Sequence, residues 1–354
     1  MKDRPIGLAI LLLVAALLSA AASSLPAAAS PALITPHYHL VRKIRLRGSG
    51  FWDYLTMDSV GRRLYITHNT HVTVLNPDTG KVIGTIANTL GVHCVALAPE
   101  LGLGFTSNGG AASVTTFSLK TLKEIRVTRT TGKDPDALVY DPASRRVFTF
   151  NGDSGSSTVI DAANGKVIGT ITLGGTPEFA VADGRGMIYN NLVDKGMLLE
   201  INTRTLRIVN RWPTACKEPT SMAMDHANRR LFIGCRDQHM QVVDADDGHL
   251  ITSLPIGQTV DATRYDPGTK LAFASCGDGG GTLTVVREVT PDNFRVAENV
   301  RTEPDARTMA EDVRTHDIFL VTSKVGPPPA ATPENPDPRD TIYPNTFVLL
   351  EYAP

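Results

Sequence analysis

The sequence has no excess of charge of either sign. It holds 35 lysine and arginine residues against 36 aspartate and glutamate residues, which gives a formal net charge of −1. A chain with that balance has no general electrostatic attraction to nucleic acid or to an anionic membrane surface. We therefore expect no nucleic-acid partner.

Cysteines and enzyme motifs are also scarce. The four cysteines, Cys94, Cys216, Cys235 and Cys276, are too few to frame a fold of this size, and they lack zinc-site spacing. A Cys216–Cys235 disulfide is sterically easier than one between neighbouring repeats, but the spacing leaves the pairing open, with buried thiols as the alternative. The chain has no glycine-rich phosphate loop, Gly-x-Ser-x-Gly or His-Glu-x-x-His, so no motif indicates a nucleotide, α/β-hydrolase or zincin site.

Only one long apolar run is present, and it lies at the N-terminus. Lys2 and Arg4 precede the run from Ile6 to Leu18, and Ala-x-Ala sites follow at 20–22 and 27–29. The run is short for a membrane span, so the pattern predicts a secretory signal peptide over 1–29, cleaved near 22 or 29. We expect a single mature domain over 30–354, monomeric, periplasmic or secreted, and not inserted in a membrane after cleavage.

A repeat of about forty residues runs through the mature chain. Its anchor is an aspartate followed by a few polar residues and an apolar strand, with clear copies at Asp58, Asp141, Asp183, Asp225 and Asp266. Ala98 fills the place in a degenerate copy, and a seventh copy lies near Ala310 to Asp312. The successive steps are 40, 43, 42, 42, 41 and then about 44 to 46 residues.

Each repeat has the pattern of four short strands. Asp-Thr-Gly at 78–80 and Ala-Asn-Gly at 163–165 are typical hairpin turns, and no helical period interrupts the strands. Four-stranded units at this spacing are propeller blades, so the sequence predicts an all-β, seven-bladed β-propeller. The last repeat lacks its fourth strand, and we expect the segment 37–47 to supply it beside 346–352 and close the ring.

The repeat resembles that of the YVTN-repeat, or YncE-like, exported propellers. The segment 64–69, Leu-Tyr-Ile-Thr-His-Asn, is close to the Tyr-Val-Thr-Asn signature of this family, and 78–83 matches its third turn, although the later repeats depart from the signature. The resemblance implies an exported seven-bladed propeller that binds or scaffolds and shares no catalytic motif.

The position five residues before each anchor is expected at the mouth of the central channel. It holds Asp53, His93, Asp136, Glu178, Thr220, Asp261 and, if the last anchor is Ala310, Asp305. Carboxylates gathered on one rim should have raised pKa values or hold a cation. Oxygen ligands suit Ca²⁺ or Mg²⁺ better than copper or zinc, and the metal-ligand candidates are Asp53, Asp136, Glu178 and Asp261. The alternative is that these side chains only complete their own turns.

Polar side chains after the second strand of several blades should lie on the same face. The ligand-binding candidates among them are Asn108, Asn151, Asn191 and Arg236, although asparagine also suits such turns for backbone reasons. His68 and His71 form either a metal or acid–base site, with His93 as a further member, or a pair of surface histidines. The arginine pairs 62–63, 145–146 and 229–230 should lie in solvated turns on the opposite face.

The last blade carries an unusual loop. Residues 325–344 include seven prolines, and a loop of this length in a compact domain is usually functional or disordered. It should lie on the rim, where it can cover the channel mouth as a stiff flap.

These features favour an extracytoplasmic binding or scaffold propeller. Its acidic channel mouth would take a small ligand, a cation or a protein partner. The alternative is a divalent-metal-dependent lactonase or lyase at the same mouth, with His93 or His68 moving protons. A rim of mostly one residue type favours binding, because catalysis needs unlike groups that converge.

Overall fold

The computed structural model describes residues 1, 37–46, 48, 50–333, 336, 338 and 340–354. The folded unit spans Thr35–Pro354. The predicted signal peptide lies outside the described residues except for Met1. No helix in the described part is long and apolar enough to cross a membrane.

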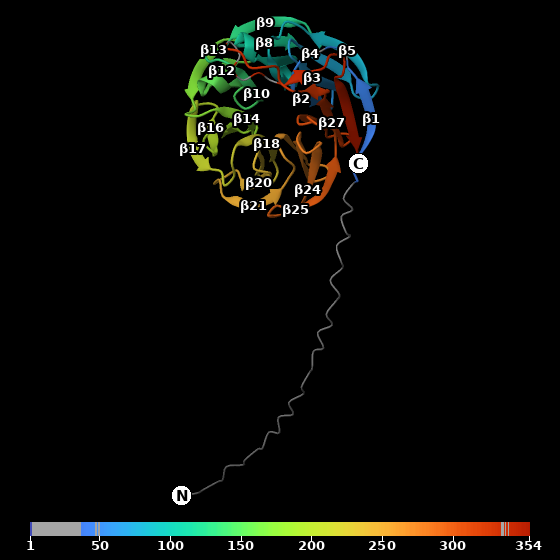
Figure 1. The fold of residues 1–354 in the computed structure, drawn as a ribbon. Helices are drawn as coiled ribbons and strands as arrows, with labels where there is room; N and C mark the ends of the chain where they lie inside the picture. Colours follow the sequence, from blue (N-terminus) through green and yellow to red (C-terminus); the bar gives the residue numbers. More distant parts are fainter. Residues whose placement is uncertain (2–36, 47, 49, 334–335, 337, 339) are drawn as a thin grey trace. The chain divides into compact units, whose positions relative to one another are not determined.

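Seven four-stranded antiparallel sheets stand around a central axis, as the sequence predicts (Figure 1). In each blade the innermost strand comes first in the chain and the outermost comes last, except in the closing blade. Blades 1 to 3 consist of β2(Trp52–Asp58), β3(Arg63–His68), β4(His71–Asn76), β5(Lys81–Ile86); β6(Val92–Ala98), β7(Leu103–Asn108), β8(Ser113–Ser118), β9(Glu124–Arg129); and β10(Pro135–Asp141), β11(Arg146–Asn151), β12(Ser156–Asp161), β13(Val167–Thr172).

The remaining blades follow the same order until the ring closes. Blades 4 to 6 consist of β14(Pro177–Ala182), β15(Met187–Leu192), β16(Met197–Asn202), β17(Arg207–Pro213); β18(Pro219–Asp225), β19(Arg230–Cys235), β20(His239–Asp244), β21(Leu250–Pro255); and β22(Val260–Asp266), β23(Leu271–Cys276), β24(Thr282–Thr290), β25(Asn293–Arg301). Blade 7 consists of β26(Met309–Asp312), β27(Asp317–Thr322), β30(Val348–Ala353) and β1(His39–Arg45).

The N-terminal strand closes the ring, which confirms the prediction. β1 pairs antiparallel with β30, with His39 opposite Ala353 at one end and Arg45 opposite Val348 at the other. Tyr38, just before β1, is 2% exposed and packs edge-on against Phe273 of blade 6 at 5.2 Å between ring centres. Its hydroxyl donates a hydrogen bond to the carbonyl oxygen of His316 at 3.0 Å. The closing strand is therefore held by side chains as well as by its ladder.

The anchor aspartates explain the repeat, because each accepts hydrogen bonds from the turn that follows it. The Asp58 carboxylate accepts from the Gly61 N–H at 2.7 Å, and that of Asp266 accepts from the Gly268 N–H at 2.8 Å. In blade 7 this role belongs to Asp312, which accepts from the Arg314 N–H at 3.1 Å. The anchor of the last repeat is therefore Asp312, two residues after Ala310. The capped turn identifies it, because the aspartate that accepts these hydrogen bonds defines the anchor in the other blades.

The first member of two arginine pairs joins neighbouring blades, and the expectation of merely solvated turns is wrong for them. Arg62 of blade 1 pairs with the buried anchor Asp312 of blade 7, and Arg229 of blade 5 lies 3.4 Å from the anchor Asp183 of blade 4. Both arginines have a positive φ, 52° and 55°. Ion pairs therefore connect neighbouring blades on the face opposite the channel mouth.

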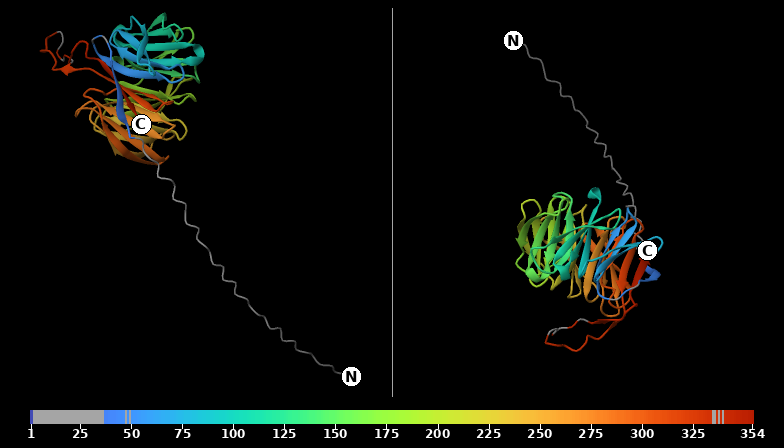
Figure 2. Two further views of the ribbon diagram at one scale, coloured as in Figure 1. Left: turned by 90° about the vertical axis from the view of Figure 1, so that its right-hand side faces the viewer. Right: turned by 90° about the horizontal axis from the view of Figure 1, so that it is seen from above.

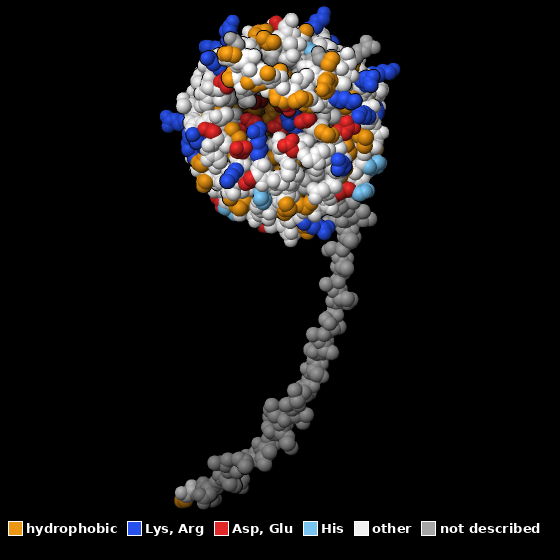
Figure 3. Space-filling model, in the orientation of Figure 1, with side chains coloured by type: hydrophobic (Ala, Val, Ile, Leu, Met, Phe, Trp, Pro, Cys, Tyr) orange, Lys and Arg blue, Asp and Glu red, His pale blue; other side chains and the backbone are white. Residues whose placement is uncertain are grey.

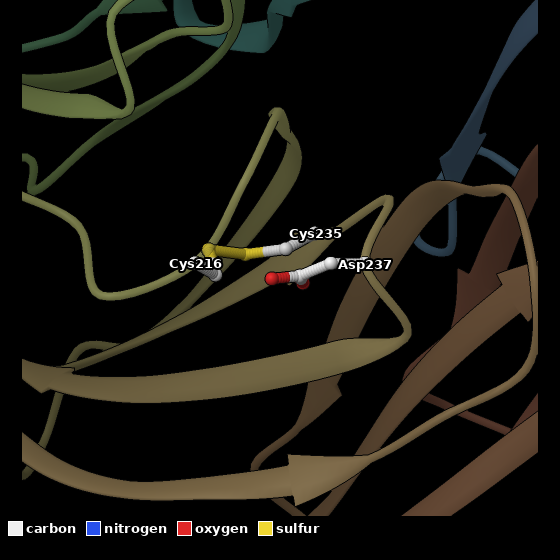
Figure 4. A group of neighbouring side chains, drawn as sticks. All are labelled: Cys216, Cys235 and Asp237. Atoms are coloured by element: carbon white, nitrogen blue, oxygen red, sulfur yellow. A yellow bond between two sulfur atoms is a disulfide. The ribbon is translucent and has the colours of Figure 1, made fainter.

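A disulfide joins Cys216 to Cys235, with 6.1 Å between the Cα atoms. It links the segment before blade 5 to the end of β19, and Asp237 lies beside it (Figure 4). The sequence favoured this disulfide on steric grounds over one between neighbouring repeats, and the structure forms it. Cys94 and Cys276 are buried free thiols.

Candidate functional site

A bulge at the start of the inner strand in blades 1 to 6 re-aims one side chain. The pairing register shifts between Trp52 and Leu55 in blade 1, and at the corresponding place in blades 2 to 6. A β-bulge leaves a residue outside the regular ladder and re-aims its side chain. The bulged residues are those five positions before the anchors, Asp53, His93, Asp136, Glu178, Thr220 and Asp261.

These bulges build a cavity of about 380 Å³ at the channel mouth. Its lining residues are Phe51, Asp53, Tyr54, His93, Asp136, Glu178, Arg236, Asp261, Arg307 and Asp340. Figure 3 shows acidic side chains in the hollow near the centre of this face, with basic side chains beside them. The structure therefore brings together six of the residues singled out from the sequence and adds Phe51, Tyr54, Arg307 and Asp340.

His93 lies at the centre of a group of carboxylates. Its Nδ1 is 2.6 Å from Oδ2 of Asp53 and 3.7 Å from Oδ1 of Asp136, and its Nε2 is 3.4 Å from Oδ1 of Asp134. Burial disfavours the charged imidazolium, but the three carboxylates outweigh it and raise the pKa of His93 to about 11. In the absence of another cation, His93 is a counter-ion for this group.

Two other carboxyl groups of the cavity, those of Asp136 and Glu178, have raised pKa values. Burial, together with the charges of Asp53 and Asp134, raises the pKa of Asp136 to about 7 even though His93 opposes it. Burial also raises the pKa of Glu178 well above its usual value, and neighbouring carboxylates add to the effect. Such shifts record the cost of several carboxylates in one poorly hydrated place.

Two arginines supply positive charge on the other side of the cavity. Arg307 donates a hydrogen bond from Nε to Oδ2 of Asp261 at 2.9 Å, and its guanidinium lies 5.3 Å from the ring centre of Trp52. Burial raises the pKa of Asp261, whereas the charges of Arg307 and Arg236 lower it. Arg307 occupies the channel-mouth position of blade 7, which the alignment at Ala310 assigned to Asp305. An alignment anchored at Asp312 assigns this position to Arg307, five residues earlier.

The remaining predicted residues do not line this cavity. Asp305 lines a neighbouring cavity of about 500 Å³ with Lys43, Lys324 and Tyr343, among others. The hydroxyl of Thr220 donates to the carbonyl oxygen of Val260 at 2.9 Å.

The three asparagines are buried within the blades. The amide nitrogen of Asn108 donates to Thr115 at 2.9 Å, that of Asn151 donates to Thr158 at 3.0 Å, and that of Asn191 donates to the Ser221 carbonyl oxygen at 3.2 Å. None of the three lines the channel-mouth cavity.

The proline-rich loop begins and ends as a small hairpin, β28(Val325–Gly326) paired with β29(Thr341–Ile342). Figure 2 shows the loop projecting from the body of the propeller. Asp340, immediately before β29, lines the channel-mouth cavity. One end of the loop therefore reaches the site, while its action as a flap stays a prediction.

His68 is not a surface residue, which was one of the two alternatives for this histidine. It is 1% exposed, stacks on Phe347 with 4.4 Å between ring centres, and does not line the channel-mouth cavity. Of the two histidines considered for proton transfer, only His93 lies in the cavity.

Comparison with known proteins identifies the fold. No protein-family model and no curated protein matches the sequence. A chain in "Crystal Structure of Mitotic Checkpoint Complex" superposes with a TM-score of 0.73 at 12% identity, over 95% of this chain and 98% of that one. "Structure of U3-55K" gives 0.72 at 8% identity, over 87% and 97%. The chain is a seven-bladed β-propeller. At these identities the likeness shows the fold alone.

Proposed function

We propose that this protein is an extracytoplasmic binding propeller of the YVTN-repeat, YncE-like kind, and that its channel mouth binds a divalent cation. The location rests on the N-terminal pattern over 1–29, and the family rests on the segments 64–69 and 78–83. The cation rests on one arrangement in the cavity, the cluster of Asp53, His93 and Asp136.

The donor atoms of this cluster are close enough to share one ion. Asp53, His93 and Asp136 each offer a ligand atom, and these atoms lie within 4.8 Å of one another. Nδ1 of His93 faces the two carboxylates, whereas Nε2 faces Asp134. Metal-bound histidines commonly donate their second N–H to a carboxylate, which fixes the ring and strengthens the ligand. Carboxylates suit Ca²⁺ and Mg²⁺, and the imidazole adds Mn²⁺ and Zn²⁺ as candidates.

The charge of the cavity supports the same proposal. Its lining has five carboxyl groups against one histidine and two arginines. Full ionisation of the carboxyls would leave net negative charge in a partly buried space, which is why the pKa values of Asp136 and Glu178 are raised. A divalent ion would stabilise the ionised carboxylates and displace protons from them.

Thermal melting and calorimetric titration of the purified mature protein test the proposal. Ca²⁺, Mg²⁺, Mn²⁺ and Zn²⁺ are each added, and a bound ion raises the Tm because it binds only the folded state. Asp136→Asn should abolish the shift. The matched control is Glu124→Gln, because Glu124 is an exposed carboxylate on the outer strand β9. If none of the four ions shifts the wild-type Tm or gives a binding isotherm, the cation proposal is wrong and the carboxylates only complete their turns.

A second candidate function is a divalent-metal-dependent lactonase or lyase. The observation that favours it is the cavity itself, whose volume of about 380 Å³ leaves room for a small organic molecule beside Arg236 and Arg307. Metal-dependent turnover of a panel of lactones by the wild type, absent from Asp136→Asn, would establish this candidate. An ion that binds without turnover of any of them leaves the binding role.

A further inference from the structure

The hairpin of blade 1 places two histidines side by side, away from the channel mouth. His68 ends β3 and His71 begins β4, and the two residues are directly paired across the strands. Paired residues on neighbouring strands have their side chains within reach of each other. The two imidazole rings are 5.0 Å apart between centres and tilted by 49°.

Both ring nitrogens of His68 lack a hydrogen-bond partner in the described part of the chain. The residue is 1% exposed, and neither Nδ1 nor Nε2 makes a hydrogen bond with the residues that the structure describes. Its ring is enclosed by Phe347 and by the chain at Gly48, where an added Cβ would lie 2.7 Å from Cε1 of His68. A buried polar group without a partner is rare in proteins, and a bound ion or water is a common explanation.

The distance between the rings suits a shared metal ion. A metal about 2.0 Å from a ring nitrogen lies roughly 3.2 Å from the centre of that ring. Two ring centres 5.0 Å apart are therefore compatible with one ion between them and an angle of about 100° at the metal, close to the tetrahedral value. We propose that His68 and His71 together bind one copper or zinc ion at the seam where β1 closes the ring.

The residues around the histidine pair leave it open to solvent and favour some metal ions over others. His71 lines a cavity of about 430 Å³ with Ile44, Thr73 and Val82, among others, so solvent can supply the remaining ligands. Arg45 lines the same cavity. The ion is therefore held by imidazole coordination and not by negative charge, which favours Cu²⁺ or Zn²⁺ over Ca²⁺ or Mg²⁺.

Copper titration of the purified mature protein, followed by electron paramagnetic resonance, tests this site. Cu²⁺ bound by two imidazoles should show splitting from two nitrogen nuclei. His71→Gln and His68→Phe should each lose one equivalent of bound Cu²⁺ and the two-nitrogen spectrum. Phenylalanine preserves the stack on Phe347, and His71 is only half-buried, so melting curves confirm that both variants fold.

Two controls separate this site from other copper ligands. His226→Gln removes an exposed histidine that follows the anchor Asp225, and Asp136→Asn disrupts the channel mouth. Both should keep the two-nitrogen equivalent. The proposal is overturned if His71→Gln and His68→Phe bind as much Cu²⁺ as the wild type with the same spectrum, since a buried water would then account for His68. Loss of that equivalent only in Asp136→Asn would also overturn it and would assign the copper to the mouth.

Discussion

Replacing Tyr38 with alanine tests how the ring is closed. The side chain is 2% exposed, packs on Phe273, and donates its hydroxyl to the His316 carbonyl oxygen. Truncating a buried aromatic residue to alanine costs about 3 to 5 kcal/mol because a cavity remains. The neutral hydrogen bond adds about 1 kcal/mol at most. We expect Tyr38→Ala to lose about 4 kcal/mol of unfolding free energy.

The corresponding change in melting temperature follows from the size of the folded unit. Thr35–Pro354 holds about 320 residues, so the unfolding entropy near the melting point is about 0.7 kcal/mol per degree. A loss of about 4 kcal/mol should then lower the Tm by about 6 °C, as measured by scanning calorimetry. Tyr38→Phe keeps the ring contact and should lower it by about 1 to 2 °C.

A third variant controls for the closing strand itself. Leu40→Ala shortens an exposed side chain on β1 and should leave the Tm within about 1 °C. An unchanged melting curve for Tyr38→Ala would refute the reasoning, because the contact between β1 and blade 6 would then contribute nothing to closure.

Four further predictions follow from the same structure. Cation affinity at the mouth should rise steadily with pH from 5 to 8, because both Asp136, whose pKa is raised to about 7, and His93, whose pKa is raised to about 11, must lose a proton to bind; calorimetry over this range measures the rise, and a flat profile would contradict it. Arg229→Ala should lower stability by about 2 kcal/mol in urea unfolding, because Asp183 is left buried without its cation, whereas Arg207→Ala, on the exposed strand β17, should change it little. Excising 327–340 with a short Gly-Ser bridge should change stability by only about 1 kcal/mol but alter ion affinity, because Asp340 is lost from the cavity; unfolding of the variant would mean that the loop is structural. Mass spectrometry of the exported protein should find a mature N-terminus near residue 23 or 30, and an intact Met1 would contradict the signal peptide.

The fold could be predicted because its repeat is set by local chemistry. Each anchor aspartate satisfies the backbone of its own turn, so its spacing is visible without any knowledge of distant contacts. The last blade was harder, since β26 has only four residues and Ala310 and Asp312 both fit the spacing. That two-residue error put Asp305 at the mouth in place of Arg307 and made the rim look more uniformly acidic than it is.

What could not be predicted depends on contacts between segments far apart in the sequence. The interblade partner of Arg62 is Asp312, 250 residues away, so the sequence around Arg62 alone predicts only a solvated turn. His68 is covered by Phe347 and Gly48, two segments that only ring closure brings to blade 1. Successive side chains of a strand point to opposite faces of the sheet. An asparagine at the end of a strand can therefore be buried or exposed, and its residue type alone did not predict which.

Anomalous diffraction from crystals of the mature protein grown with Mn²⁺ tests the central claim, a cation site at the channel mouth, most directly. We predict a single strong anomalous peak about 2.2 Å from Nδ1 of His93 and from carboxylate oxygens of Asp53 and Asp136, absent from Asp136→Asn crystals grown in the same way. A mouth without anomalous density, with His93 still hydrogen-bonded to Asp53 at a saturating Mn²⁺ concentration, would contradict it.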